Sequence, residues 1–589
     1  MKIDYSKDKL LTEFSMKTLQ DRYMIPGESS PQEAFARAAT AFSDDEDHAQ
    51  RLYDYASNLW FMFATPVLSN GGTERGMPIS CFLNYVEDSR EGITDHYTEN
   101  AYLSSFGGGI GGSWSDVRSQ GTKTSKGSES TGAIPFMKVV DAEMLAFSQG
   151  ITRRGSYAGY LHISHPEVEE FLDMRKPTGG DTNRKCLNLH HGVVISDKFM
   201  ETIHRATKED NFNDDWELID PHSKEVKKVV SARTLWVKIL QNRMETGEPY
   251  LMFEDAVNSE LPEFQKKKGL YVNHSNLCSE ITLATNEERT AVCCLSSVNL
   301  EYYDDWKKIP AFIPDLIRML DNVLEHFIKK APPQMHRAVY SAMRERSIGL
   351  GAMGFHAYLQ KNSIPFEGMW ANTANIEMFR YIKDHALEET RRLAVERGAC
   401  PDDDSCEVRN AHLLAIAPNA SSSIICGNTS PSIEPFRANA YTQKTKSGSY
   451  LQKNKYLDDV LMSKIGHTEV YENTWKSIVA NKGSVQHLDM LSEEEKEVFK
   501  TAVEINQAWV VEHASNRQPY ICQSQSVNLF FPPDVNKGDL HNVHMLAWAK
   551  NLKTLYYLRS EAISRADNVS NQVKREIIFE QSDCLSCEG

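Results

Sequence analysis

The chain has 589 residues, which is too long for one ordinary globular core and predicts roughly two to four lobes, or one large α/β body with attachments. Hydrophobic residues make up 41% and charged residues 25%, values that exclude general disorder. The net charge of -16 argues against a dedicated nucleic-acid-binding protein, although a small nucleotide site, which needs only a few local donors, remains open.

The N-terminal residues and the cysteine count bear on the cellular compartment. No run of about 18 apolar residues occurs, so the sequence predicts no transmembrane helix. Residues 1–14 carry Lys, Asp and Glu and lack the apolar core of a signal peptide, so we expect a cytoplasmic protein. The 11 cysteines are too few for a disulfide scaffold, and in a reducing compartment they indicate reactive, redox-active or metal-binding roles.

Several helices and strands can be predicted in chain order. The apolar run 192–195, followed by a helical pattern, predicts a strand and then a helix. Apolar residues at helical spacing predict a helix over 314–327, and Gly398 with Pro401 marks the end of another. Ser492 with Glu495 is a capping box, after which apolar residues up to Trp509 predict one long buried stripe. Together these patterns indicate an α/β chain with a large helical share.

Residues 104–132, 148–159 and 418–423 are predicted to be ordered loops. Gly107–Gly112 formally matches G-x-G-x-x-G, but the lead-in is weak and no second strand follows, which disfavours a dinucleotide fold. A close backbone approach to a ligand is the preferred interpretation, with a plain tight turn as the alternative. Pro418–Ser423 offers hydroxyls that suit a phosphate if a helix follows, and otherwise is a simple turn.

The cysteines differ in what their neighbours allow. Cys584 and Cys587 form a C-x-x-C pair in a terminal segment predicted to be mobile, and a redox dithiol is favoured over zinc because no further ligands lie nearby. Asn276, Cys278 and Glu280 alternate, so an extended segment would group a thiol, an amide and a carboxylate on one face. The alternative is a buried cysteine with two incidental polar neighbours. Taken alone, Cys81, Cys293–Cys294 and Tyr556–Tyr557 are typical of a core.

The order of these segments resembles that of the large catalytic subunit of class I ribonucleotide reductases, from about residue 58 to the end. The matching segments are Ala64–Ser69, Ile79–Phe82, the Gly107–Gly112 loop, Ser148–Gly150, Asn276–Glu280, Val292–Ser296, Pro418–Ser423, Leu555–Tyr557 and the terminal C-x-x-C. The resemblance implies a ten-stranded α/β barrel over 61–565 with a central finger loop. A short helical region over 1–60 would precede the barrel, and a mobile redox tail over 566–589 would follow it.

The family chemistry, carried onto the matching residues, implies reduction of ribonucleotides, most simply the diphosphates, to 2′-deoxyribonucleotides. Cys278 would become a thiyl radical that abstracts the 3′ hydrogen, with Glu280 as the base and Asn276 orienting the substrate. Cys81 and Cys293 would supply two electrons as water leaves, and Cys294, on the opposite face of the strand, would not. Cys584 and Cys587 would then carry electrons from thioredoxin or glutaredoxin.

The resemblance also implies two nucleotide sites. The chain has Asn419-Ala420-Ser421 where some members have Ser-Glu-Thr, which leaves the phosphate contacts open. An allosteric specificity site, read by nucleoside triphosphates with Mg²⁺, would use Asp88, Arg118 and the loops 119–132 and 148–155, including Gln149, Arg153 and Arg154. The residues implied for the substrate are Thr65, Ser80, Gly109, Pro418, Asn419, Ala420, Ser421 and Ser422.

Tyr556 and Tyr557 favour class I, in which the radical arrives from a separate ferritin-like dimetal subunit. The chain itself would then bind no metal or cofactor and would form a homodimer. About 60 residues precede the barrel segment, too few for the ATP-binding cone of many relatives, so we expect no overall-activity site. The alternatives are a cobalamin-dependent reductase of the same fold, a nicotinamide dehydrogenase built on Gly107–Gly112, and a non-catalytic paralogue.

Overall fold

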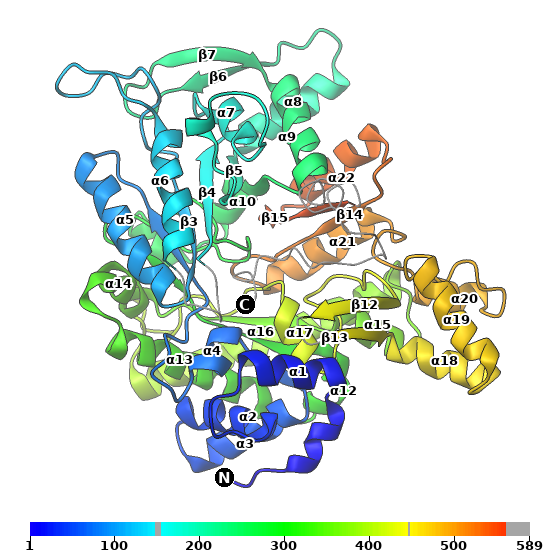
Figure 1. Ribbon diagram of the computed structural model, residues 1–589. Coiled ribbons are helices and arrows are strands. Elements are labelled where there is room, and N and C mark those ends of the chain that lie inside the picture. The colour runs from blue at the N-terminus through cyan, green and yellow to red at the C-terminus, as the bar shows by residue number, and fades with distance from the viewer. Residues whose placement is uncertain (148–154, 446–447, 561–589) are drawn as a thin grey trace.

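The computed structural model describes residues 1–147, 155–445 and 448–560, and it confirms an α/β chain with many helices (Figure 1). Five parallel strands form one half of the central barrel, each hydrogen-bonded to the next. Helices α5 (Arg90–Ser105), α6 (Ala133–Ala146), α7 (Val168–Asp173), α8 (Asp197–Lys208) and α9 (Ala232–Thr246) connect them. The five strands are β2 (Cys81–Tyr85), β3 (Gly109–Ser113), β4 (Tyr157–His162), β5 (His190–Ile195) and β8 (Tyr250–Phe253).

The second half of the barrel is also parallel. Strand β10 (Leu295–Asn299) pairs with β11 (Gly349–Met353), which is bridged to Leu414. Ile416 is bridged in turn to Gln525, and β14 (Leu529–Phe531) pairs in parallel with β16 (Leu558–Ser560).

Two seams join the halves in antiparallel fashion. At one seam β9 (Ala291–Cys293) pairs with β2, and the chain passes through Cys294 into β10. At the other, β15 (Thr554–Leu555) pairs with β8, and the chain passes through Tyr556–Tyr557 into β16. The closed barrel therefore has the predicted ten strand positions, which in order are β2, β3, β4, β5, β8, 554–560, 525–531, 413–416, β11 and 291–299.

Strand β3 corrects one expectation, because Gly109–Ser113 lies inside a segment that we predicted to be a loop. A Cβ on Gly111 would lie 2.4 Å from the carbonyl oxygen of Ser275, and one on Gly109 would lie 2.9 Å from a methyl carbon of Leu277. Glycine at these alternating positions removes the side chains that would fill the barrel on this side. The close approach is to another part of this chain.

That part is a finger loop inside the barrel. Residues 274–285 have no helix or strand, yet all are buried. A buried loop must satisfy its backbone polar groups through specific partners, and these come from the surrounding strands.

The N-terminal region is helical, with α1 (Glu13–Arg22), α2 (Pro31–Ala41) and α3 (Glu46–Ser57) ahead of β1 (Phe61–Phe63), which pairs with β10. Helix α1 packs against α17 (Ala420–Ile425), where the Ser15 hydroxyl donates to the Ile424 carbonyl at 2.6 Å. In Figure 1 these helices lie below the barrel, next to α4 (Thr65–Asn70).

The outer helices largely match the sequence patterns. Helix α13 (Phe312–Lys330) buries the predicted stripe, and α16 (Met369–Arg397) ends at Gly398 with φ 87°. The capping box of Ser492 and Glu495 is present, but it opens only the short helix α20 (Glu493–Val498). The stripe predicted after Ser492 therefore does not lie on one helix: a separate helix, α21 (Gln507–Arg517), begins after Asn506, whose side chain accepts from the Ala508 amide.

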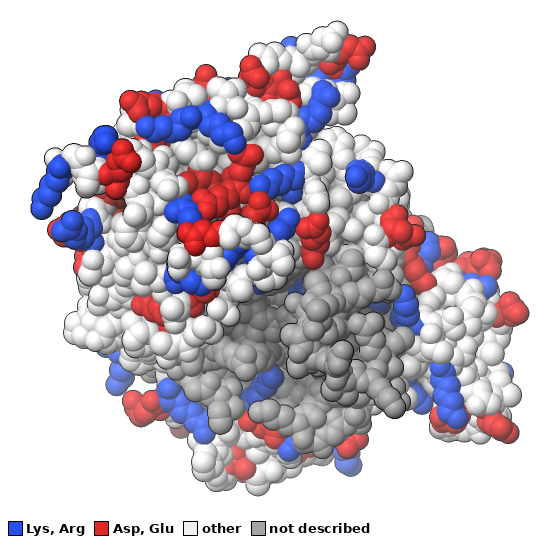
Figure 2. All heavy atoms as spheres, turned by 45° about the horizontal axis from the view of Figure 1, so that its top comes forward, with Lys and Arg blue, Asp and Glu red and all other residues white. Residues whose placement is uncertain are grey.

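The remaining elements decorate the barrel. Among them, α18 (Lys455–Ile465), α19 (Glu469–Ala480) and α20 form a lobe with its own small core at the right of Figure 1. Charges of both signs intermingle over the described surface drawn in Figure 2. None of the described helices is long and apolar enough to cross a membrane. The elements that decorate the barrel are η1 (Tyr5–Leu10), η2 (Thr182–Arg184), β6 (Asp215–Ile219), β7 (Val226–Ser231), α10 (Glu254–Ser259), α11 (Glu263–Lys267), η3 (Leu300–Tyr302), α12 (Tyr303–Trp306), η4 (Pro333–Met335), α14 (His336–Glu345), α15 (Phe355–Lys361), β12 (Ala440–Thr445), β13 (Gly448–Lys453), α18 (Lys455–Ile465), α19 (Glu469–Ala480), α20 (Glu493–Val498), η5 (Gln518–Tyr520) and α22 (Lys537–Ala549).

Candidate active site

Cys278 lies near the tip of the finger loop, where its backbone neighbours are tied to the barrel wall. The hydroxyl of Ser526 donates to the Cys278 carbonyl at 2.5 Å, and that of Thr554 donates to the Ser279 carbonyl at 2.7 Å. From β4, the Tyr160 hydroxyl donates to the Asn276 carbonyl at 2.7 Å. Three hydroxyls from distant strands thus hold the tip in place.

The tip is a tight turn, so the extended segment assumed for Asn276, Cys278 and Glu280 is wrong. Ser279 adopts φ 66°, in the left-handed region. Asn276 Oδ1 accepts from the amides of Glu280 at 3.1 Å and Ile281 at 3.2 Å, which closes the turn. The turn nevertheless groups the three residues, since the Ser526 hydroxyl reaches both the Cys278 carbonyl and Glu280 Oε2, the latter at 3.3 Å.

Two buried polar groups near the tip have hydrogen-bonding capacity to spare. Within the described chain, neither Asn276 Nδ2 nor the hydroxyl of Ser80 has a hydrogen-bond partner, and both residues are 0% exposed. A buried donor without a partner is costly, so such groups mark places where a ligand would supply one.

The carboxyl group of Glu280 is buried beside thiols. Burial, with a smaller contribution from Cys81, raises the pKa of Glu280 to about 8, against an ordinary value of 4.5. At neutral pH the group is therefore mainly protonated and can change its protonation state within the physiological range.

Cys81 and Cys293 lie directly opposite each other across the seam between β2 and β9. Both are buried thiols. Burial and the contact with Cys81 raise the pKa of Cys293 well above its usual range, so this thiol is held protonated. Residues paired in this way have Cβ atoms roughly 4.5–5.5 Å apart, close to the separation that a disulfide requires.

Cys294 points the other way. Its thiol donates to the carbonyl of Leu320 on α13 at 3.3 Å, outside the barrel. The alternation of side chains along the strand therefore puts Cys293, and not Cys294, beside Cys81.

Tyr556 and Tyr557 share a buried cluster with Cys278 and Leu277. The two rings are in contact, with centroids 4.4 Å apart, but are tilted at 52°, so the pair is not stacked in parallel. Tyr250 of β8 touches both rings, with centroid separations of 4.8 Å and 5.1 Å. A continuous group of aromatic rings therefore adjoins the finger loop.

The predicted phosphate residues gather at the end of the barrel where Cys81 begins β2. The strand 413–416 runs in the opposite direction to β2, so its carboxyl end opens on this side, and α17 begins there at Ala420. Asn419 has φ 55°, and its side chain bonds the Ser297 hydroxyl at 2.8 Å. Pro418 precedes it. The other residues predicted for the substrate, Thr65, Ser80, Gly109, Ser421 and Ser422, are all buried.

At the opposite end of β2, Asp88 accepts from Arg118 Nε at 2.9 Å, and His222 Nδ1 lies 3.2 Å from the same carboxylate. The loop after Arg118 is anchored by Asp220, which accepts from the hydroxyls of Ser119 and Thr122. The structure brings Asp88 and Arg118 together. The other residues predicted for the effector site, Gln149, Arg153 and Arg154, lie outside the described residues, as do Cys584 and Cys587.

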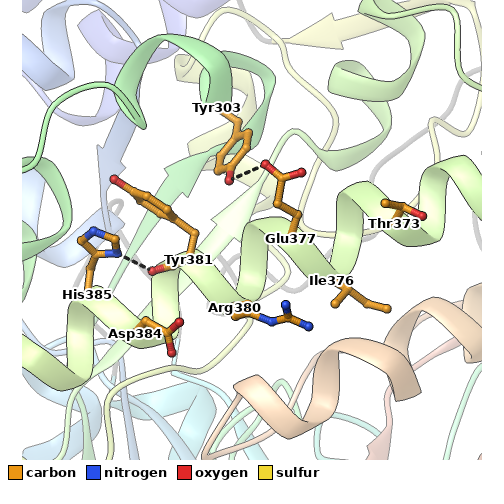
Figure 3. Close-up of a pocket in the computed structure, with 8 residues that line it drawn as sticks. All are labelled: Tyr303, Thr373, Ile376, Glu377, Arg380, Tyr381, Asp384 and His385. Carbon is orange, nitrogen blue, oxygen red and sulfur yellow. Dashed lines mark hydrogen bonds between the residues drawn. The ribbon is translucent and has the colours of Figure 1, made fainter.

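Two further features bear on ligand binding. A groove of about 490 Å³ lies along α16 and is lined by Tyr303, Tyr381 and His385 among others (Figure 3). None of the residues predicted for catalysis lines it, so its size carries less weight than the chemistry around Cys278. Over the described ranges, no group of three or more His, Cys, Asp or Glu residues could hold a metal ion.

Comparisons with known proteins decide the family. A model described as "Ribonucleotide reductase, barrel domain" matches residues 79–407 and 403–558, and one described as "Ribonucleotide reductase, all-alpha domain" matches residues 9–76. The chain belongs to the ribonucleotide reductase family. It is 44% identical to the ribonucleoside-diphosphate reductase large subunit of Invertebrate iridescent virus 3, over 100% of both chains. It is 48% identical to the putative large subunit of Frog virus 3, over 92% of both.

A solved structure agrees with this assignment. The class Id ribonucleotide reductase alpha subunit of Actinobacillus ureae superposes with a TM-score of 0.82 at 34% identity, covering 96% of this chain and 100% of that one. Ribonucleotide reduction is therefore the activity of this large subunit, and neither the cobalamin-dependent nor the nicotinamide-dependent alternative is favoured. Membership of this family implies a small-subunit partner and nucleotide effectors.

Several residues of the site could not be found from the sequence. Tyr160, Ser526 and Thr554 hold the fingertip, Tyr250 touches the tyrosine pair, and Glu248 contacts His190, which lies beside the Tyr557 hydroxyl. None has a local motif, and the positions that they contact lie up to several hundred residues away. The signal lies in the pairing of the strands, which a single sequence does not reveal.

Proposed function

We propose that this chain reduces ribonucleoside diphosphates to 2′-deoxyribonucleoside diphosphates, with Cys278 as the radical-bearing thiol. The observation that carries the proposal is the arrangement inside the barrel: a fingertip thiol, a titratable carboxyl group and a facing pair of buried cysteines. The relatives named for ribonucleoside-diphosphate reduction support the choice of diphosphates.

The reaction begins with the Cys278 thiyl radical, which takes the hydrogen atom from C3′ of the ribose. Glu280 takes the proton of the 3′ hydroxyl, for which a pKa of about 8 is suitable. The 2′ hydroxyl leaves as water. Asn276 Nδ2, which lacks a partner in the described chain, is available to donate to a ribose hydroxyl.

Cys81 and Cys293 provide the reducing equivalents. Each gives up a hydrogen, two electrons pass to the substrate, and an S–S bond forms between the two sulfurs. Cys278 then returns a hydrogen atom to C3′, so the radical is recovered. The net change is one ribonucleotide and one dithiol to one deoxyribonucleotide, one water and one disulfide.

The remaining roles complete the proposal. Cys584 and Cys587 re-reduce the disulfide with electrons from thioredoxin or glutaredoxin. A ferritin-like dimetal small subunit supplies the oxidation, which passes through Tyr557 and Tyr556 to Cys278. Asp88, Arg118, Gln149, Arg153 and Arg154 bind a nucleoside triphosphate that selects the substrate, and two copies of the chain form a homodimer. The α17 turn, with Thr65, Ser80 and Gly109, binds the substrate.

The test is conversion of CDP to dCDP by the chain with its small subunit, dithiothreitol and an effector, with CTP as a parallel substrate. Cys278→Ala should abolish product formation, whereas Cys294→Ala, a matched change of a buried cysteine that points outside the barrel, should retain it. Product from Cys278→Ala would remove that thiol from the mechanism. Turnover of CTP alone would contradict the assignment to diphosphates.

A further inference from the structure

Tyr557 has polar neighbours that the chemistry above does not use. Its hydroxyl lies 3.3 Å from Nδ1 of His190, which belongs to β5. The same nitrogen lies 2.6 Å from Oε1 of Glu248, and Arg175 forms an ion pair with that oxygen. Arg175 Nη1 also lies 3.2 Å from His190 Nδ1. The phenol oxygen thus lies at the edge of a compact charged cluster.

The carboxylate at the centre of the cluster is held from two sides. Glu248 is 1% exposed, and its Oε2 accepts from the amide of His191 at 3.0 Å and lies 2.9 Å from His191 Nδ1. Burial alone would raise the pKa of Glu248, but Arg175 and His190 lower it well below its usual range. Glu248 is therefore anionic and fixed, because moving it would leave a buried charge without its partners.

Aromatic contacts extend this frame to Tyr557. The rings of His190 and Tyr250 are nearly parallel, at 18°, with centroids 6.2 Å apart, and Tyr250 touches Tyr557 edge to face. Arg559 lies over the Tyr557 ring, with its guanidinium carbon 4.1 Å from the ring centroid. Tyr557 is thus flanked by an imidazole, a phenol ring and a guanidinium.

We propose that Arg175, Glu248 and His190 are positioning residues for radical exchange at Tyr557. They hold its hydroxyl in one orientation beside Tyr556 and give its oxygen a fixed hydrogen-bond environment, and they take up neither the electron nor the proton. The proposal rests on the radical route through the tyrosine pair proposed above. Radical exchange between two phenols depends steeply on their separation and orientation, so residues that fix one of the phenols control the rate of exchange.

His191 provides a matched control within the same strand. It contacts the same carboxylate as His190, but its ring lies against Phe171 and the Leu172 carbonyl of α7, outside the barrel. A substitution of His191 removes a partner of Glu248 but leaves the contact between His190 and Tyr557 in place. It therefore shows how far Tm and kcat fall when Glu248 alone is disturbed.

The experiment uses the full chain with its small subunit and compares His190→Leu, His190→Asn, His191→Phe and Tyr557→Phe. His190→Leu should lower kcat about tenfold with KM for CDP within about twofold, because a misoriented phenol slows transfer without altering substrate binding. His190→Asn, whose amide can occupy the place of Nδ1, should recover part of the loss. His191→Phe should lower Tm as much as His190→Leu does but reduce kcat less.

A spectroscopic reading separates orientation from general damage. With 3-aminotyrosine at position 557, the trapped radical should show a shifted g-tensor in His190→Leu and a near-native one in His190→Asn, since the g-tensor reports hydrogen bonding to the oxygen. Equal loss of kcat in His190→Leu and His191→Phe, or an unchanged g-tensor in His190→Leu, would overturn the proposal. If His190→Leu does not fold, kcat and the g-tensor of the trapped radical are compared between His190→Asn, His191→Phe and wild type instead. An active Tyr557→Phe would instead refute the radical route itself.

Discussion

Strand β3 approaches the finger loop so closely that a single methyl group should misplace the thiol of Cys278. In Gly111→Ala the new Cβ would lie 2.4 Å from the Ser275 carbonyl oxygen and 2.9 Å from the Asn276 Cα, both of them backbone atoms. Real Cβ contacts essentially never fall below 3.0 Å, so the finger must retreat by about 0.6 Å. Overpacking of this kind costs about 1–3 kcal/mol of stability. A shift approaching 1 Å in a reacting group costs about 100-fold in rate.

We therefore expect Gly111→Ala to fold with a modestly lowered Tm and to lose about 10- to 100-fold in kcat for CDP reduction. The assay is dCDP formation with the small subunit in excess, alongside thermal unfolding. Gly159→Ala is the matched control, because that glycine lies on the neighbouring strand β4 and its nearest atoms would be 3.7 Å away, an ordinary contact. Gly109→Ala should be intermediate, since its closest neighbour is a methyl carbon of Leu277 that can rotate away.

Two outcomes would refute this reasoning. If Gly111→Ala kept more than half of the wild-type kcat at unchanged Tm, the finger would have room that the structure does not show. If Gly159→Ala lost as much activity as Gly111→Ala, the effect would come from strand flexibility and not from the finger contact.

Further predictions concern Glu280, the adjacent cysteines 293 and 294, and Asp88. Because burial raises the pKa of Glu280 to about 8, kcat/KM should rise as the pH passes through that value, and Glu280→Gln should lack this rise. The free energy of unfolding should change in the opposite direction, because the folded state binds the Glu280 proton more tightly than the unfolded state does. As the pH rises from 4.5 to about 8, wild type should therefore lose stability relative to Glu280→Gln, as measured by urea unfolding. Cys293→Ser should lower multiple-turnover activity at least about 100-fold, whereas Cys294→Ser should change it less than about twofold. Asp88→Ala, which leaves Arg118 without its 2.9 Å partner, should weaken dTTP binding about tenfold in calorimetry.

Each of these predictions has a contrary outcome. A pH profile shared by wild type and Glu280→Gln would assign the ionisation to another group. Equal losses in the two serine variants would mean that the side of the strand on which a cysteine lies does not matter. Unchanged dTTP affinity in Asp88→Ala would move the effector site away from that ion pair.

Local patterns predicted the parts of this fold in which local forces dominate. The stripe of α13, the glycine that ends α16 and the capping box of Ser492 depend on residues within one or two helical turns, and all three are present. The order of the motifs, and not any single motif, predicted the barrel and its cysteines. The pairing of Cys81 with Cys293 shows why, since a span of more than 200 residues separates two thiols that face each other.

The failures have a common physical cause. Gly109–Ser113 was predicted to be a loop because glycine is unfavourable in strands, yet here the missing side chains make room for the finger. The stripe after Ser492 continues to Ile505 as buried residues, although α20 has already ended, because burial follows from packing and not from the helix alone. In both cases a distant segment changes the meaning of a local pattern.

The two seams also depend on contacts between distant segments. Closing two parallel halves in antiparallel fashion requires one chain segment at each seam to leave one partner strand and join another, as 291–299 and 554–560 do. The residues at the crossing points, Cys294 and Tyr556–Tyr557, lie outside both ladders. Cys293, the last residue of β9, and the tyrosine pair therefore lie at or next to the points where the barrel changes direction. At each seam one segment thus serves two partner strands, which places Cys293 opposite Cys81 and packs the tyrosine pair against Cys278 of the finger.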